Sequence, residues 1–319
     1  MDVAQLRTLL CVAELGSLSK AAERLRVAQP ALSRQVRLLE EELRAPLFVR
    51  HGRGMTPTEA GTKVLARAAL VMRQLEEIQA EVVTDRSHLS GQVILGIPPT
   101  VMEIITVPLT RAFQAEFPRV RLRFVSAFGG YLLEWLERGD IDLAVLYDPQ
   151  PVRGLRTEPL MVENLFAVGS PAHDYSLQDG VPLIRVAKER LFLPSARHGL
   201  RKLVDKAARD LPISIDVKLE VDSLSALKDL VLAGMGTTIL PLASVYADVK
   251  AGRLTAGPVF DPPLTRRLVL AYSAARPIPS AAKELGRAVV RQVHALVDSG
   301  VWAGHSLQNL GGEAHTRMI

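Results

Sequence analysis

Apolar residues recur at helical spacing three times within the first fifty positions. The first stretch runs from Leu6 to Ala13, and Gly16 then offers the backbone freedom that ends a helix. Ser19 precedes a second stretch, which ends at Leu25, and its hydroxyl is expected to cap that helix. A third helix is predicted from Gln29 to Glu42, with a buried stripe of Leu32, Val36, Leu39 and Leu43.

The opposite side of the third predicted helix is polar. Its side chains are short or planar, and such groups fit the edges of base pairs in a major groove. Gln pairs with adenine, Arg pairs with guanine, and a proline ring can lie against a thymine methyl group. We therefore predict base contacts from Gln29, Pro30, Ser33, Arg34 and Arg37.

A basic hairpin is expected directly after the third helix. Segments 47–49 and 55–57 flank a tight, glycine-containing turn that carries Arg50 and Arg53. From residue 20 to residue 53 there are eight Lys or Arg and four Glu, an excess of four positive charges (8 − 4). We predict that the two arginines contact phosphates or enter a minor groove. An ordinary solvated surface is the alternative, but the order of elements favours a winged helix-turn-helix that binds DNA.

The positive charge of the chain is concentrated in the segment from residue 20 to residue 53, and the composition gives no sign of catalysis. The whole chain of 319 residues has a net charge of +5, close to the excess in that one segment. The single Cys11 excludes an intrachain disulfide and supplies no metal cluster. Seven scattered His and this one Cys show no spacing that would assemble a catalytic set. We therefore expect neither an enzyme nor a bound cofactor or metal.

A heptad-like pattern follows the hairpin and predicts a long helix that pairs two subunits. The apolar positions are spaced four, three, four, three and four, which is typical of a two-helix seam. A second apolar flank leaves open that the helix packs on a domain of its own chain. The predicted dimer seam consists of Val64, Ala68, Val71, Leu75, Ile78 and Val82.

Strand and helix patterns alternate beyond residue 91. Predicted strands at 92–97, 119–125 and 141–147 are separated by predicted helices, and the alternation repeats from Leu160 to Leu240. Alternation of this kind predicts an α/β fold with parallel sheets. We therefore expect two similar α/β lobes.

Several loops between strands and helices should face a cleft between the lobes. The segment 98–100 joins a strand to a helix, and free backbone N–H groups at such a helix start attract anions. Simple helix capping by Thr100 and a structural role for His198 are the alternatives. The residues predicted to contact a ligand are Thr100, Ser126, Phe128, Ser195, His198 and Thr237.

These segments resemble one family, the LysR-type transcriptional regulators. The resemblance rests on residues 21–25, 29–33, 38–40, 47–48 and 56–61 and on Arg50, while Ala28 departs from the usual Ser or Thr that caps the recognition helix. It implies a winged helix-turn-helix at 1–58, a linker helix and hinge at 59–90, and a periplasmic-binding-protein-like effector domain at 91–300. Lobe one would comprise 91–161 and 265–300, lobe two 162–264, and residues 301–319 would form a flexible tail.

The resulting hypothesis is a sequence-specific transcriptional regulator controlled by a small-molecule effector. The resemblance implies pseudo-palindromic promoter DNA, a carboxylate or aromatic metabolite as effector, and a homodimer or homotetramer, with RNA polymerase as a candidate further partner. A ligand-independent architectural DNA-binding protein is the alternative. We expect a cytoplasmic protein without a membrane partner, because neither an export signal nor a long uncharged apolar run is present.

Overall fold

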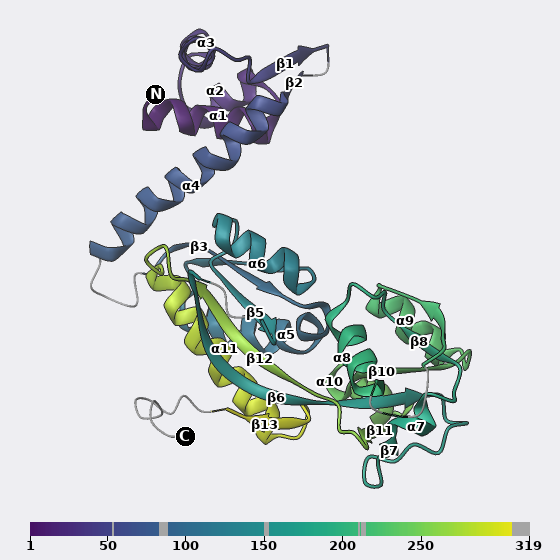
Figure 1. Cartoon of the computed structure of the whole chain (residues 1–319). Coiled ribbons are helices and arrows are strands. Elements are labelled where there is room, and N and C mark those ends of the chain that lie inside the picture. The colour runs from purple at the N-terminus through teal and green to yellow at the C-terminus, as the bar shows by residue number, and fades with distance from the viewer. Residues whose placement is uncertain (53, 83–88, 150–152, 210, 212–214, 308–319) are drawn as a thin grey trace. The chain divides into compact units, whose positions relative to one another are not determined.

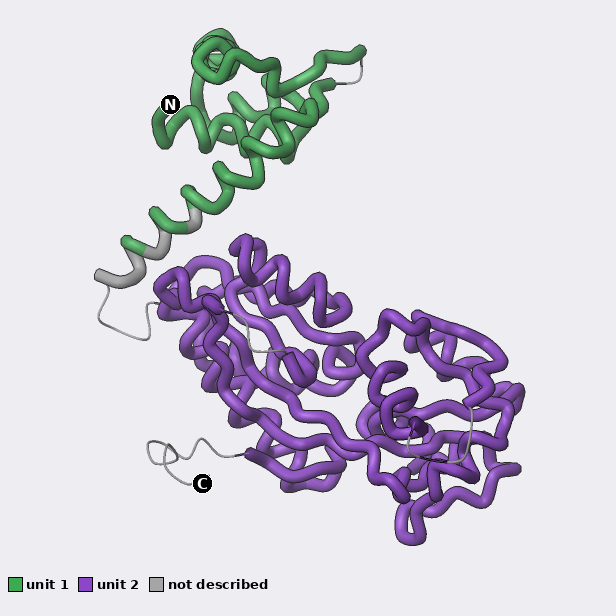
Figure 2. The backbone as a smooth tube through the Cα atoms, in the orientation of Figure 1, with its two compact units in different colours: residues 1–86 green, residues 87–319 purple. Residues whose placement is uncertain are grey.

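The chain forms two compact units, residues 1–86 and 87–319, which are described separately (Figure 2). The computed structural model describes residues 1–52, 54–82, 89–149, 153–209, 211 and 215–307. Within the long helix of the first unit, the backbone alone is described at 73, 76, 77 and 79–82.

The first unit contains the predicted three helices, hairpin and long helix (Figure 1). Its buried side chains form one cluster that joins all three short helices to the hairpin and to the start of the long helix. The elements are α1 (Val3–Leu15), α2 (Leu18–Leu25), α3 (Gln29–Leu43), β1 (Phe48–His51), β2 (Gly54–Pro57) and α4 (Glu59–Val82).

The helix ends follow local chemistry, with one correction. Gly16 adopts φ 60° after α1, in the left-handed region that glycine tolerates. The cap of α2 is Ser17, whose hydroxyl accepts from the Lys20 backbone N–H, so the prediction of Ser19 was wrong. Ser19 lies inside the first turn instead. Ala28 precedes α3 and makes no side-chain cap, as its methyl group requires.

The second unit consists of two α/β lobes. Lobe one begins with β3 (Gly91–Ile97), α5 (Pro99–Glu116), β4 (Val120–Ser126), α6 (Gly129–Arg138) and β5 (Leu143–Tyr147), after which β6 (Leu155–Gly169) leads into lobe two. Lobe two contains β7 (Val181–Pro182), α7 (Leu183–Val186), β8 (Leu191–Leu193), α8 (Gly199–Ala208), β9 (Val217–Glu220), α9 (Leu224–Leu232), β10 (Thr237–Pro241), α10 (Leu242–Lys250) and β11 (Thr255–Phe260). The chain returns through β12 (Thr265–Ser273), α11 (Ser280–Asp298) and β13 (Gly304–Ser306).

The sheets are mixed rather than parallel throughout. In lobe one, β3 pairs in parallel with β4 and β5, but β12 runs antiparallel to β5 and to β6. The reason is that β6 and β12 carry the chain between the lobes in opposite directions (Figure 1). Pairing of β6 passes from β12 to β10 between Asn164 and Leu165, beyond the predicted crossing near Met161.

The predicted flexible tail, residues 301–319, begins several residues too early in the chain. Trp302 is 1% exposed, and its indole N–H donates to Glu163 Oε1 at 2.6 Å. Gly304–Ser306 then pairs with β6 as a short antiparallel strand. Residues 301–307 therefore belong to lobe one, because a large buried ring and the pairing of three residues with β6 hold them in place. Residues 308–319 lie outside the described part of the chain.

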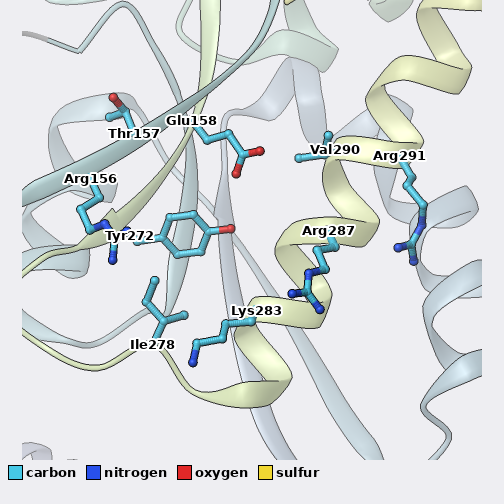
Figure 3. A pocket seen from close by; sticks show the side chains of 9 residues that line it. All are labelled: Arg156, Thr157, Glu158, Tyr272, Ile278, Lys283, Arg287, Val290 and Arg291. Carbon is cyan, nitrogen blue, oxygen red and sulfur yellow. The ribbon is translucent and has the colours of Figure 1, made fainter. Parts of the chain in front are cut away.

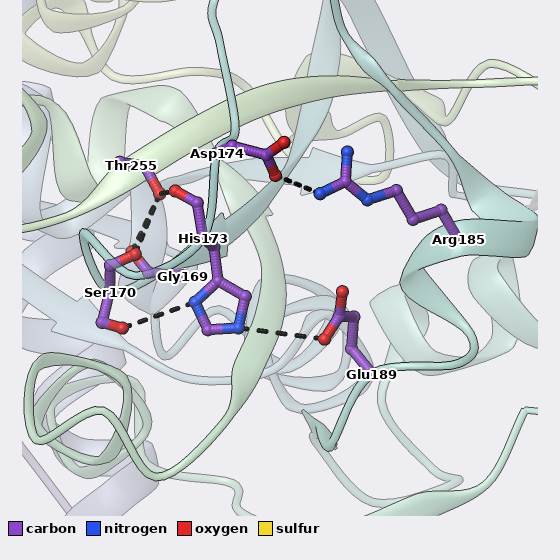
Figure 4. Close-up of polar contacts among 7 residues, drawn as sticks. All are labelled: Gly169, Ser170, His173, Asp174, Arg185, Glu189 and Thr255. Atoms are coloured by element: carbon purple, nitrogen blue, oxygen red, sulfur yellow. Dashed lines mark hydrogen bonds and ion pairs between the residues drawn. The ribbon is translucent and has the colours of Figure 1, made fainter.

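A polar turn closes the end of β6 in lobe two (Figure 4). The Thr255 hydroxyl on β11 donates to the carbonyl oxygens of Ser170 at 3.1 Å and of His173 at 2.9 Å. The His173 ring lies between Ser170 Oγ, at 3.4 Å, and Glu189 Oε2, at 3.8 Å. These contacts hold the turn against lobe two.

None of the described helices is long and apolar enough to cross a membrane.

Candidate functional site

The polar side of α3 is presented to solvent. Gln29, Pro30, Arg34 and Arg37 are exposed, and Ser33 is half-buried. This exposure follows from the sequence, because the apolar stripe on the opposite side of the helix is buried in the first unit's core. The predicted base-contacting residues therefore share one accessible helix face.

Arg50 on the wing lies beside that helix face. Its Nη2 donates to Ser33 Oγ at 3.3 Å, which links β1 to α3. Arg37 pairs with Glu41 one turn further on, at 3.4 Å between exposed groups, and keeps several N–H donors unoccupied. Arg53 lies outside the described residues, so its contact with DNA stays a prediction.

Two polar contacts that sequence reasoning missed hold the reading elements in place. The Thr8 hydroxyl is buried and donates to Gln35 Oε1 at 2.6 Å, joining α1 to α3. Glu40 Oε1 accepts from the backbone N–H of Leu47 at 2.7 Å and of Phe48 at 3.2 Å, joining α3 to the wing. Neither contact has a local sequence signal, because the partners are brought together by the packing of separate elements.

Glu40→Ala is expected to lower the free energy of unfolding of the first unit by about 2–3 kcal/mol, because two partly buried backbone donors lose a charged acceptor. Chemical denaturation followed by circular dichroism measures the change. Glu41→Ala is the matched control, since this carboxylate is exposed and its ion pair is with the exposed Arg37. Equal stability of the two variants would contradict a special role for Glu40.

The predicted dimer seam divides into two parts. Ala68 is 2% exposed, and with half-buried Val64 it packs on the core of the winged unit. The prediction for Ala68 is therefore corrected, because the intrachain core already buries it, whereas Val64 stays partly exposed and its role in the seam stays a prediction. Val71 and Ile78 are 41% and 60% exposed, Leu75 is half-buried, and the Val82 side chain lies outside the description.

In the second unit, side chains from facing loops and helices connect the two lobes. The rings of Phe128, before α6, and His198, before α8, make an edge-on contact with centroids 4.7 Å apart. A second bridge joins Glu103 on α5 to Lys228 on α9 at 3.1 Å. Two of the predicted ligand contacts, Phe128 and His198, are thus in direct contact across the cleft.

The His198 imidazole is neutral at pH 7. Its Nδ1 accepts from the Leu200 backbone N–H at 3.1 Å, which caps α8. Burial, and secondarily the nearby Arg266 cation, lower the pKa of His198 from its ordinary value of 6.5 to about 4. With Nδ1 engaged as an acceptor, the remaining ring proton is on Nε2 and is available as a donor.

The depressed pKa of His198 makes stability dependent on pH. Because the unfolded chain takes up this proton near pH 6.5 and the folded chain only near pH 4, stability is expected to fall as the pH drops through that window. Asn at position 198 also caps a helix but does not titrate. Thermal unfolding is measured from pH 7 to pH 4. His198→Asn should reduce the loss of stability over this range, whereas His305→Asn, at an exposed position, should leave that loss unchanged. An identical pH profile for both variants would rule out the contribution.

A buried cation lies where β12 and β6 cross between the lobes. Arg266 is 6% exposed; its Nε pairs with Glu163 at 2.5 Å, and its guanidinium carbon lies 3.5 Å from the centroid of the Tyr147 ring. The Tyr147 hydroxyl lies 3.0 Å from Thr100 Oγ1, and burial raises the pKa of this tyrosine, so its proton is retained. Arg266 Nη2 is buried without a hydrogen-bond partner among the described residues. A buried, unpaired guanidinium N–H calls for an acceptor.

Sequence reasoning missed Arg266, Glu163 and Tyr147, although one signal was present. Arg266 and Leu268 alternate with exposed positions at the start of β12, so the period of two places the arginine on the buried side. The partners Glu163 and Tyr147 come from β6 and β5 and are found only when the strands pair.

The remaining predicted ligand residues differ in position. Ser126 is exposed at the end of β4, and the Ser195 backbone N–H donates to Asp222 at 2.9 Å. Thr237 is fully buried in β10, and its side chain lies by Tyr175 in the core of lobe two. The prediction that Thr237 faces the cleft is therefore corrected, because every residue of β10 is buried within lobe two.

Comparison with known proteins decides the family. The model described as "LysR substrate binding domain" matches residues 86–293, and that described as "Bacterial regulatory helix-turn-helix protein, lysR family" matches residues 3–62. The chain belongs to the LysR family of transcriptional regulators. This LysR-type protein binds DNA and carries an effector-binding domain, as both the resemblance and the fold indicated.

Relatives match over three quarters or more of the chain. The "Nitrogen assimilation regulatory protein nac" of Escherichia coli (strain K12) is 38% identical over 242 residues, which cover 76% of this chain and 78% of that protein. The "HTH-type transcriptional regulator BbuR" of Bordetella bronchiseptica is 30% identical over 305 residues, covering 96% and 94%. The solved structure of the Corynebacterium glutamicum OxyR C206 mutant has a TM-score of 0.66 at 25% identity and covers 94% of this chain and 95% of that one.

Proposed function

We propose that the exposed side of α3 reads bases and that the wing contacts the DNA backbone. The support is geometric, because four polar side chains share one accessible helix face and Arg50 stands beside it. Gln29 and Arg34 would make the bidentate base contacts, Pro30 and Ser33 would fit around them, and Arg50 would bind phosphate. Arg37 and Arg53 would extend the contact along the duplex.

The effector we assign to the interlobe cleft is a small carboxylate with an apolar or aromatic body. The observation that carries this assignment is the buried Arg266 Nη2, which lacks an acceptor among the described residues. A carboxylate oxygen would satisfy it, with further donation from Thr100 or from His198 Nε2. The rings of Phe128 and His198 would pack against the apolar part.

Effector binding would act by biasing the arrangement of the two lobes. The Phe128–His198 and Glu103–Lys228 contacts bridge the lobes, and β6 and β12 carry the chain between them. A ligand at Arg266 shifts the equilibrium only as far as it prefers one lobe arrangement over another. In the dimer, that preference would change how paired α4 helices present the two α3 helices to pseudo-palindromic half-sites.

Val71, Leu75 and Ile78 are the residues we assign to the dimer interface. Exposed apolar groups one heptad apart need a partner helix, and none is provided by the described part of the first unit. Pairing of such dimers would form a homotetramer, and RNA polymerase would be the further partner on promoter DNA.

Ile78→Asp is expected to weaken self-association by about one hundredfold or more, because it places a charge in an apolar seam. Analytical ultracentrifugation across a range of protein concentrations measures the effect. Gln74→Asp, at an exposed position one turn away, is the control and should dimerise like the parent chain. If Ile78→Asp also dimerised normally, the seam would have to lie elsewhere.

A calorimetric screen of small carboxylates tests the proposed effector. At least one carboxylate should bind saturably and alter the DNA footprint, since the two binding events are linked. If no carboxylate changed either stability or the footprint, effector control through this cleft would lose its support. The ligand-independent architectural role would then be the better account.

A further inference from the structure

A second concave surface lies entirely within lobe one. The cavity has a volume of about 570 Å³, within the usual range for small-molecule sites (Figure 3). Its nearest member, Glu158, lies five positions before Glu163 on β6, or roughly 17 Å along the strand. It is lined by Arg156, Thr157, Glu158, Tyr272, Ile278, Lys283, Arg287, Val290 and Arg291.

The lining is strongly cationic. Four Lys or Arg side chains face one carboxylate, an excess of three positive charges (4 − 1). Lys283, Arg287 and Arg291 recur every fourth residue and form one stripe along α11, while Arg156 comes from the opposite wall, β6. Like charges one helical turn apart repel one another, so this stripe costs stability unless anions offset it.

Protein carboxylates neutralise only part of this charge. Arg287 pairs with Glu284 at 2.7 Å and Arg291 with Glu116 at 3.3 Å. These pairs hold the two guanidinium groups in position and leave other N–H donors free for a ligand. Within the described part of the chain, neither Arg156 nor Lys283 has an acidic group at ion-pairing distance. Arg156 and Lys283 therefore supply positive charge that no protein carboxylate of the described chain neutralises at short range.

Tyr272 forms the floor of the cavity and adds a neutral donor. It pairs across the strands with Arg156, and its hydroxyl points toward α11 (Figure 3). The helix approaches so closely that a Cβ at Gly286 would lie 2.0 Å from this hydroxyl oxygen, so a larger residue there would displace the tyrosine ring. Burial, and then the Glu158 carboxylate, raise the pKa of Tyr272, which keeps its proton. Ile278 and Val290 supply apolar surface.

A solvated row of arginines on a convex helix would not explain this arrangement. Here cations from a strand and from a helix converge on one concavity, together with a phenol donor and apolar contacts. We propose that the cavity binds a small organic polyanion, a phosphorylated or polycarboxylated metabolite, as a second ligand distinct from the one in the interlobe cleft. Its walls include β6 and β12, the strands that carry Glu163 and Arg266, so its occupancy is coupled to the lobe crossing.

Titration calorimetry on the full-length chain, at about 0.15 M ionic strength to suppress weak surface binding, tests the proposal. The probes are inorganic pyrophosphate and citrate. Saturable binding of pyrophosphate alone would assign the phosphorylated class, binding of citrate alone the polycarboxylated class, and binding of both the shared polyanion chemistry. Absence of saturable binding of either probe in the millimolar range would overturn it.

Variants locate the binding. Lys283→Glu and Arg156→Glu, both at exposed positions, should each lower the affinity for the probe by about tenfold or more. Lys206→Glu on α8 makes the same charge change outside the cavity and should have no effect. Arg34→Glu controls for polyanion binding to the basic face of α3. If affinity fell in Arg34→Glu but not in the two cavity variants, the site would be the DNA-binding face and the proposal would be wrong.

Discussion

Replacing Arg266 by Leu should lower the free energy of unfolding of the second unit by about 3–5 kcal/mol, because Glu163 is left as an unpaired buried charge. Glu163 is 1% exposed; one carboxylate oxygen pairs with Arg266, and the other accepts from the Trp302 indole N–H. Denaturation in urea measures the loss. The double variant with Glu163→Leu should recover most of it, since the uncompensated charge is removed along with its partner.

A milder change at the same position separates ligand binding from folding. Arg266→Lys keeps the charge beside Glu163 but lacks the second arm of the guanidinium that would reach a ligand. Calorimetry should show carboxylate affinity reduced by about tenfold or more, with effector-free DNA binding retained. Arg267→Lys, at the exposed neighbouring position, should bind the effector normally. Unchanged affinity in Arg266→Lys would remove this arginine from the proposed site.

Loss of the two planar side chains on α3 should erase sequence preference. Gln29→Ala and Arg34→Ala are each expected to cost about 1–3 kcal/mol on the preferred operator and much less on random DNA, because each removes a bidentate base contact. Arg50→Ala and Arg53→Ala should instead weaken binding to all sequences and reduce the salt slope by about one each. Fluorescence anisotropy at several salt concentrations separates the two behaviours.

Lys206→Ala in lobe two is the control for charge loss and should leave both preference and salt slope unchanged. Uniform weakening on every DNA by all four variants at α3 and the wing would contradict the division between base reading and backbone contact. The Arg50 result is especially informative, because its contact with Ser33 places it between the wing and the reading helix.

The winged unit was predictable because its signals are local. The buried stripe of α3 repeats with the helical period, Gly16 ends α1, and the turn at the wing joins two short apolar segments. The one misplaced cap, Ser19 for Ser17, arose because two serines flank one apolar residue. Ala68 fits a heptad seam, yet the winged core buries it; the spacing alone cannot distinguish an intrachain neighbour from a partner subunit.

Ligand sites depended on contacts over long sequence separations. Arg266 and Glu163 are 103 residues apart, and their pairing exists only because β6 and β12 cross between the lobes. Thr237 follows a turn that was expected to face the cleft, but the strand it starts, β10, is buried along its whole length in lobe two. The cavity beside Tyr272 requires α11, β6 and β12 together, and none of its segments carries a recognisable motif.

By itself, the amino-acid sequence determined that this chain has a DNA-reading head, a long connecting helix and two α/β lobes, since periodicity, helix caps and turn residues act over a few neighbouring positions. The tertiary structure alone decided which cations become buried, which apolar residues stay uncovered and where concave surfaces form. Those properties arise when strands and helices that are distant in the sequence pack together and exclude water. Patterns among neighbouring residues do not show which distant elements will pack together.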